Sequence, residues 1–181
     1  MIILQSLYFM LPAYLANMVP VFAQKLGILN FFSRAVDGNK TWKGKPIFGT
    51  HKTWRGFLVG IPMAVAIVWF QYFLFRIPVF QEISLLNYLK INPWLLGFLM
   101  GFGALFGDLI KSFFKRRISL LPGAPWIPFD QIDFVLGTLI FTAPVYFPPW
   151  PAVGIILLAS PVLHVITNNI GYLLRVKDTR W

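Results

Sequence analysis

The sequence has no cysteine, only six acidic residues and only two histidines among its 181 residues. Without cysteine the chain has no disulfide, no thiolate nucleophile and no cysteine-ligated zinc. Charged residues make up 12% of the chain, whereas hydrophobic residues make up 57% and aromatic residues 18%. Because a water-soluble domain this apolar would precipitate, the composition predicts an integral membrane protein.

Long apolar runs fill most of the sequence. A bilayer core about 30 Å thick requires roughly 20 apolar residues per helix, so the chain accommodates about five crossings. The runs lie at residues 2–24, 57–75, 93–114, 132–150 and 152–174, with loops at 25–56 and 115–131. Because the runs are continuous rather than alternating, they favour helices over barrel strands. We therefore expect an all-α integral membrane protein of about five transmembrane helices, forming one domain over residues 1–181.

The third run contains two pairs of glycines spaced four residues apart, Gly97/Gly101 and Gly103/Gly107. This spacing is typical of closely packed membrane helices. We interpret these glycines as packing residues.

Lysines and arginines give the chain a net charge of +10, and their positions predict its orientation. By the positive-inside rule, the basic segments face the cytoplasm, which places the N-terminus outside and the C-terminus inside. Nucleic-acid binding is then unnecessary to explain the charge, and an anionic ligand is expected at the basic loops. Fourteen of the sixteen cations lie on these alternate segments: Lys25, Arg34, Lys40, Lys43, Lys45, Lys52 and Arg55, then Lys111, Lys115, Arg116 and Arg117, then Arg175, Lys177 and Arg180.

The stretch "GDLIKSFFKRR", residues 107–117, ends the third run. Asp108, Lys111, Ser112 and Lys115 are spaced i, i+3, i+4 and i+7, so they share one helical face. A carboxylate directly after an apolar run is costly unless it faces protein, water or a cation, which makes Asp108 a candidate functional residue. The alternative is a structural ion pair between Asp108 and Lys111 or Lys115.

Two further carboxylates, Asp130 and Asp133, lie three residues apart in "PFDQIDF" at the start of the fourth run. Helix capping explains either one alone. Half of the six acids nevertheless flank one short loop, and carboxylate oxygens are ligands that magnesium prefers. We therefore predict that Asp108, Asp130 and Asp133 bind Mg²⁺. Since this group contains no His, Cys or Glu, zinc or iron is disfavoured.

The first basic loop ends in "HKTWRG", where Lys52 and Arg55 precede a helix and Gly56 follows them. Such a position suits a polyanion, although cations that anchor a helix at the membrane boundary are the common alternative. Lys43 and Lys45 in the same loop are further candidates for phosphate contacts. In the fifth run, His164, Asn168 and Asn169 are expected to make hydrogen bonds between helices.

Taken together, "GDLIKSFFKR", the following "DQID" and the upstream "HKTWRGF" resemble the CDP-diacylglycerol synthase family. The short chain and the loop "PGAPWIPFDQIDF" resemble most closely its archaeal branch, the CDP-archaeol synthases. The resemblance covers residues 49–60 and 101–137. Compared with bacterial members, the loop after Arg116 lacks a Lys-Asp pair and a His-Gly-Gly stretch, and Lys111 stands where many of them have Glu.

The resemblance implies an enzyme that joins CTP to digeranylgeranylglyceryl phosphate, an isoprenoid lipid phosphate, and releases pyrophosphate. It implies catalytic roles for Asp108, Asp130, Asp133 and Lys115. By position, Lys52, Thr53, Gly56, Ser112 and Arg116 also match the family motifs. The full set of expected nucleotide and phosphate contacts is Lys43, Lys45, Lys52, Thr53, Arg55, Lys111, Ser112 and Arg116.

Two other classes use similar residues. A CDP-alcohol phosphotransferase also handles CDP-lipids with magnesium, but the sequence has no Asp-Gly-x-x-Ala-Arg element. A small transporter or channel could use an intramembrane carboxylate such as Asp108.

The predicted orientation can be tested because the chain has no cysteine. A single cysteine placed at Asn39 or Ser119 should be protected from an impermeant thiol reagent in intact cells, since both loops are expected to face the cytoplasm. A cysteine at Gln81, in the loop between the second and third runs, should react. The opposite labelling pattern would reverse the orientation.

Overall fold

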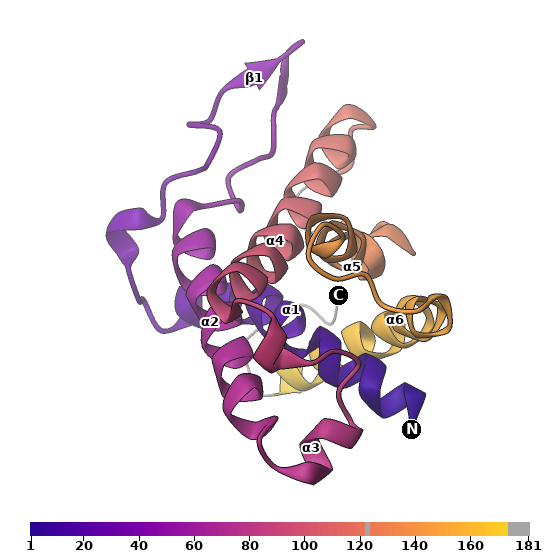
Figure 1. Ribbon diagram of the computed structural model, residues 1–181. Coiled ribbons are helices and arrows are strands. Elements are labelled where there is room, and N and C mark those ends of the chain that lie inside the picture. The colour runs from indigo at the N-terminus through magenta and orange to yellow at the C-terminus, as the bar shows by residue number, and fades with distance from the viewer. Residues whose placement is uncertain (122–123, 174–181) are drawn as a thin grey trace.

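The computed structural model describes residues 1–121 and 124–173 and is built almost entirely from helices (Figure 1). The last residue of the expected fifth span and the basic residues Arg175, Lys177 and Arg180 lie outside the described residues. The elements, in chain order, are α1 (Ile2–Lys25), η1 (Asn30–Phe32), β1 (Thr41–Trp42), β2 (Lys45–Pro46), α2 (Trp54–Leu74), α3 (Pro78–Glu82), η2 (Tyr88–Lys90), α4 (Pro93–Arg117), α5 (Phe129–Thr142) and α6 (Trp150–Leu173).

Four of the described helices are long and apolar enough to cross a membrane, namely α1, α2, α4 and α6. They coincide with four of the expected spans to within a few residues, which confirms a helical, multi-pass membrane protein. The exact number of crossings and the orientation of the termini stay predictions.

The fourth expected span, residues 132–150, differs most from the sequence-based expectation. Helix α5 has 14 residues, begins at Phe129 and ends at Thr142. At about 1.5 Å per residue it is about 21 Å long, which is short of the roughly 30 Å apolar core. The helix ends just before Pro144, because proline has no N–H to continue the hydrogen-bond ladder and disfavours a helical residue before it. Pro148 and Pro149 follow soon after.

The loop boundaries also shift relative to the expectation. Helix α4 continues to Arg117, so Lys115, Arg116 and Arg117 belong to its last turn rather than to a loop. At the other basic segment, α2 begins at Trp54 and includes Arg55. The connecting segments at this end are therefore residues 26–53 and 118–128.

Helix α4 lies at the centre and packs against α1, α2 and α5. Its glycines allow the neighbouring backbones to approach closely, as predicted. A Cβ on Gly97 would lie 2.5 Å from Val65 Cα of α2, and one on Gly107 would lie 2.2 Å from the Asp133 carbonyl oxygen of α5. The packed interior is completed by fully buried apolar side chains, among them Phe9, Met10, Val68, Leu96, Met100, Val135 and Ile156.

The two ends of the helical bundle carry different connections (Figure 1). The segment that contains the β1–β2 hairpin extends from one end, whereas α3 lies at the opposite end. The hairpin pairs Thr41 with Pro46 and Trp42 with Lys45 in antiparallel register. The basic loop and the segment around α3 are thus well separated, as the predicted topology requires.

The contact between α4 and α5 predicts a strong effect of a single methyl group. In Gly137→Ala the new Cβ would lie 2.1 Å from the Gly103 carbonyl oxygen, so the helices must separate. We expect the free energy of unfolding to fall by about 1–3 kcal/mol, measured by thermal unfolding in detergent.

Gly154→Ala in α6 is the matched control, because nothing lies within 4 Å of its added Cβ. Alanine also has the higher helix propensity, so this variant should be neutral or slightly stabilised. If Gly137→Ala were as stable as Gly154→Ala, the close contact between α4 and α5 would not hold.

Candidate functional site

The last turns of α4 present the four polar residues that the sequence placed on one face. Ser112 Oγ donates a hydrogen bond of 2.9 Å to the Asp108 carbonyl oxygen within the helix. Lys111 and Lys115, one turn apart, both extend toward α5, where they pair with its acidic first turn. The helical spacing is thus sufficient to bring the α4 residues to one site.

The first turn of α5 supplies the other two carboxylates. Asp130 closes a local ring with Trp126: the Asp130 N–H donates to the Trp126 carbonyl at 2.9 Å, and the Trp126 N–H donates to Asp130 Oδ2 at 2.6 Å. Asp133 Oδ1 accepts from the Phe134 N–H at 2.7 Å. Because Gly107 contacts the Asp133 backbone directly, the α5 carboxylates are held beside Asp108.

Asp108, Asp130 and Asp133 converge on one point, and we call them the carboxylate cluster. The ammonium of Lys111 occupies that point. Lys111 Nζ lies 2.8 Å from Asp108 Oδ1, 3.1 Å from Asp130 Oδ1 and 2.7 Å from Asp133 Oδ2. The predicted convergence of the three acids is therefore present, and Lys111, expected to contact phosphate, faces the acids instead.

Two more ammonium groups flank the carboxylate cluster. Lys115 Nζ lies 3.0 Å and 3.1 Å from the two oxygens of Asp130 and also donates to the Ala124 carbonyl. Lys52, from the distant basic loop, pairs with Asp108 Oδ2. Lys52 is a quarter exposed, so its ion pair is the most accessible of the set.

The charge of Asp130 follows from these neighbours. Burial raises the pKa of its carboxyl, but the Lys111 ammonium and the Trp126 N–H outweigh burial, so this pKa lies below its ordinary value. Asp130 therefore stays ionised at neutral pH. Its contribution to stability is present above the pKa of the unfolded chain and is lost as the pH falls through the lowered folded pKa.

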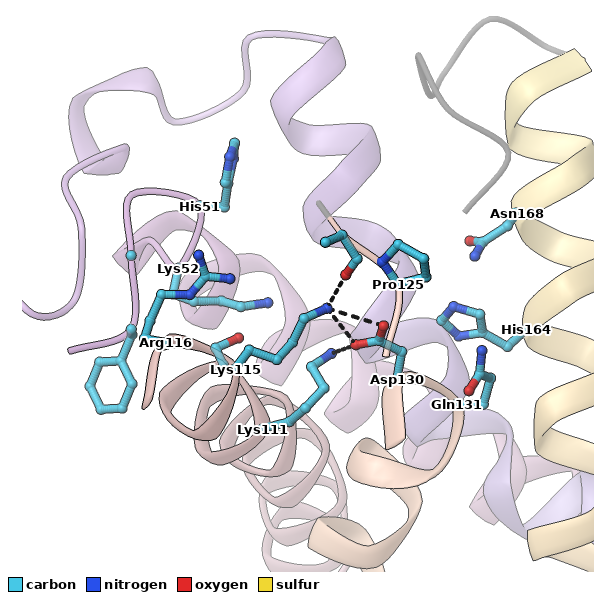
Figure 2. A pocket seen from close by; sticks show the side chains of 14 residues that line it. His51, Lys52, Lys111, Lys115, Arg116, Pro125, Asp130, Gln131, His164 and Asn168 are labelled. Carbon is cyan, nitrogen blue, oxygen red and sulfur yellow. Dashed lines mark hydrogen bonds and ion pairs between the residues drawn. The ribbon is translucent and has the colours of Figure 1, made fainter. Parts of the chain in front are cut away.

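A polar cavity of about 310 Å³ opens beside the carboxylate cluster (Figure 2). Its walls come from the loop around His51, from α4, from α5 and from α6. Lys115 and Arg116 reach it from α4, and His164 and Asn168 face it from α6. Cations on one side and polar groups on the other make this cavity suitable for a phosphorylated, polar ligand.

A second cavity of about 290 Å³ lies on the other side of Lys52. It shares His51, Lys52 and His164 with the polar cavity, and Asp108 and Arg55 also line it. The Arg55 guanidinium is buried and donates to Asn30 Oδ1 at 3.0 Å. Lys52 therefore lies between two cavities that belong to one site.

The remaining predicted residues divide between the site and its support. Thr53 lines the second cavity, and Ser112 lines the polar cavity. Lys43 is exposed beside the Trp42 ring in the hairpin. Lys45 donates to the Arg117 carbonyl at 2.9 Å and to Ser119 Oγ at 2.6 Å. Lys43 and Lys45 thus line neither cavity.

Arg117 joins the hairpin to the end of α4. Its guanidinium donates to the carbonyls of Trp42, Lys45 and Pro46 and stacks over the rings of Trp42 and Phe113. The basic loop is thus fixed to α4, the helix that carries Lys111 and Lys115.

Asp37, which the sequence reasoning did not select, organises the basic loop from within. Its carboxylate accepts from the N–H groups of Asn39, Phe48 and Gly49 at 2.8–3.1 Å. Burial raises the pKa of this carboxyl, but the three N–H groups lower it below its ordinary value. The signal in the sequence was the Asp-Gly-Asn turn, whose aspartate typically accepts backbone hydrogen bonds.

Gln131, His164 and Asn168 were also not assigned to the site. The Gln131 side chain is buried at the cavity wall, and among the described residues its Oε1 has no hydrogen-bond partner. His164 and Asn168 are spaced i, i+4 in a mainly apolar run, which was the available signal. In an apolar helix such a pair can indicate a polar wall as well as a contact between helices.

Comparison with known proteins relates this arrangement to one family. The family model described as CarS-like CDP-archaeol synthase matches residues 1–181. The CDP-archaeol synthase of Pyrococcus furiosus is 38% identical over 99% of this chain and 98% of its own length. That of Methanococcoides burtonii is 40% identical over 95% of this chain and 100% of its own length.

This chain belongs to the CDP-archaeol synthase family. A solved structure described as an intramembrane enzyme for the biosynthesis of archaeal membrane lipids has a similar fold, with a TM-score of 0.74. It is 27% identical in sequence, and the match covers 92% of this chain and 94% of the other. The resemblance of the two motif regions to the CDP-archaeol synthase family is confirmed over the full length.

The position of Lys111 in this CDP-archaeol synthase fold predicts that replacing it makes the free energy of unfolding depend on Mg²⁺. Lys111→Met leaves three close carboxylates without their central cation, which should lower the free energy of unfolding by about 3–5 kcal/mol in the presence of a chelator. Three converging carboxylates then resemble an oxygen-ligand site, so Mg²⁺ should restore part of the loss. Thermal unfolding with and without Mg²⁺ measures both effects.

The control is Lys90→Met, which removes an exposed lysine outside the site. It should unfold like the wild type in either buffer. Wild-type stability of Lys111→Met in chelator would show that the Lys111 ammonium does not hold the carboxylate cluster together.

Proposed function

We propose that this protein is the CTP-dependent cytidylyltransferase that activates an isoprenoid ether lipid phosphate, digeranylgeranylglyceryl phosphate, to its CDP-lipid. The observation that carries the proposal is a site of three carboxylates and several cations at the ends of apolar helices, in a chain that matches the CDP-archaeol synthase family throughout. An amphiphilic lipid and a water-soluble nucleotide can meet only at such a boundary.

The reaction joins two anions. A phosphate oxygen of the lipid attacks the α-phosphorus of CTP, the bond from that phosphorus to the bridging oxygen breaks, and pyrophosphate leaves with the electron pair. A phosphate monoester is largely ionised near neutral pH, with a second pKa of about 6, so the chemistry requires no dedicated general base. The site must instead align the reactants and neutralise their charge.

We propose three side chains for that task. Lys52, Lys115 and Arg116 line the polar cavity from two segments that are far apart in sequence. Their charges would hold the triphosphate, because ammonium and guanidinium groups make strong, charge-assisted hydrogen bonds to phosphate oxygens. Lys52 pairs with Asp108, so phosphate binding would exchange one partner for another rather than desolvate a free cation.

Mg²⁺ is the cofactor we propose, with Asp108, Asp130 and Asp133 as its ligands. Among the described residues, no group of three or more histidine, cysteine or acidic side chains is arranged to hold a metal ion, and ammonium groups pair with all three carboxylates of the cluster. The donor types nevertheless suit magnesium, and a carboxylate can accept at both oxygens. Release of the accessible Lys52 would free Asp108 Oδ2. When bound, Mg²⁺ would supply charge neutralisation at the phosphates.

The site faces the cytoplasm in this proposal, where CTP is available. The positions of the basic residues support this orientation, since Lys52, Lys115 and Arg116 gather at one end of the bundle and α3 lies at the other. The protein would then be a multi-pass protein of the cell membrane with its active site on the cytoplasmic side.

The decisive experiment is an assay of the purified protein for pyrophosphate release. Release should require both CTP and the lipid phosphate, should stop when divalent cations are chelated, and should resume with Mg²⁺. A small transporter or channel would release none. Lys115→Ala and Lys52→Ala should each lower kcat/KM roughly ten- to a hundredfold, the usual cost of a lost charged contact.

Lys90→Ala, near the opposite end of the bundle from the basic loop, serves as the control and should keep the wild-type kcat/KM. If Lys52→Ala also behaved like the wild type while Lys115→Ala was impaired, the basic loop would be only a membrane anchor. Full activity in chelator would exclude the magnesium role.

A further inference from the structure

An apolar groove of about 510 Å³ lies between α4 and α5. Its lining includes Ile110, Phe114, Trp126, Phe129, Leu136 and Ile140. Five of these six side chains are between 40% and 68% exposed, so the described chain leaves the groove open. Trp126 and Phe129 pack together with ring centroids 4.4 Å apart and form part of its wall.

The groove adjoins the charged site. Lys111 and Asp133, which pair within the carboxylate cluster, also line the groove, and Lys111 lines the polar cavity as well. An apolar surface and a phosphate-binding surface therefore meet at one lysine. Such a junction matches an amphiphile whose head group must reach cations while its chain stays in apolar surroundings.

We propose that the α4–α5 groove binds an isoprenoid chain of the lipid phosphate, which places the lipid phosphate beside Lys111, where groove and polar cavity meet. This inference rests on the proposed cytidylyltransferase function and assigns the lipid half of its substrate site. CTP would occupy the polar cavity, so the two substrates approach Lys111 from opposite sides.

A second apolar groove, between α1 and α6, is the rival position. Its volume is about 300 Å³, and Leu11 and Leu163 are among its lining residues. It shares His164 with the polar cavity but contains no member of the carboxylate cluster. A chain bound there would place its phosphate beside His164 rather than beside Lys111. The larger groove that adjoins the cluster is therefore the better site.

Every lipid-facing helix touches bilayer lipids, so the experiment must separate a substrate site from a general lipid contact. Leu136→Trp and Ile140→Trp fill the α4–α5 groove, and Leu163→Trp fills the rival groove. Leu158→Trp is the matched control, because Leu158 is 78% exposed on α6 and lines neither groove. Pyrophosphate release is measured in mixed micelles of fixed composition, with long-chain and short-chain isoprenoid lipid phosphates.

We expect Leu136→Trp and Ile140→Trp to raise KM for the long-chain lipid phosphate about tenfold or more, the discrimination typical of a filled apolar pocket. The KM for CTP and the KM for the short-chain lipid should change less than about twofold, since neither ligand occupies the distal groove. Leu158→Trp and Leu163→Trp should match the wild type. Circular dichroism and thermal unfolding show which variants are folded. Leu136→Trp and Ile140→Trp test the same groove independently.

Three outcomes would overturn the proposal. If both groove variants fold and keep the wild-type KM for the long-chain lipid, the groove is only a bilayer surface. If Leu163→Trp raises that KM instead, the chain binds between α1 and α6. If the wild type releases no pyrophosphate with any lipid phosphate, the proposed function itself fails, which is a separate result because it requires no variant.

Discussion

The direct backbone contact between α4 and α5 is the constraint on which the site depends. Gly103 and Gly107 of α4 meet Gly137 and the Asp133 backbone of α5 at distances that leave no room for a Cβ. This contact holds the two helices so close that one side chain, Lys111, reaches carboxylates on both of them. Asp130 and Asp133 can therefore share Lys111 with Asp108, and a wider crossing would separate the acids from the ammonium. The same helix pair forms both the floor of the polar cavity and the walls of the apolar groove.

The site is nearly neutral in itself, although the protein is strongly basic. Three carboxylates face Lys52, Lys111 and Lys115, so charges near the membrane boundary are paired within a few ångströms. Unpaired, each would carry a desolvation cost of several kcal/mol. Further positive charge lines the polar cavity, on residues such as Arg116. A polyanion in the polar cavity would thus meet several cations, and of the three carboxylates only Asp130 lines that cavity.

Helical periodicity explains why much of this arrangement could be read from the sequence. Asp108, Lys111 and Lys115 share a face because their spacing fixes it, and the four long apolar runs became helices for the same local reasons. Properties that depend on distant segments were not readable. The end of α5 at Thr142 is a different case, because Pro144, Pro148 and Pro149 are visible in the sequence and hydropathy alone passed over them. The position of Lys111 depends on how closely α5 approaches, and the role of Asp37 depends on Phe48 and Gly49 folding back onto it. The metal and phosphate roles stay predictions.

The basic loop is held at several points by contacts within the protein. Asp37 ties its interior, the Val36 N–H donates to the Lys52 carbonyl at 2.8 Å, and Arg117 fastens the hairpin to α4. Fixing the backbone of a free residue costs roughly 1–2 kcal/mol of conformational entropy. If the loop were flexible, it would have to become ordered each time a substrate bound, and this entropy cost would weaken binding. Here that cost is met once, during folding, and Lys52 and its neighbours would offer the proposed nucleotide a preorganised surface.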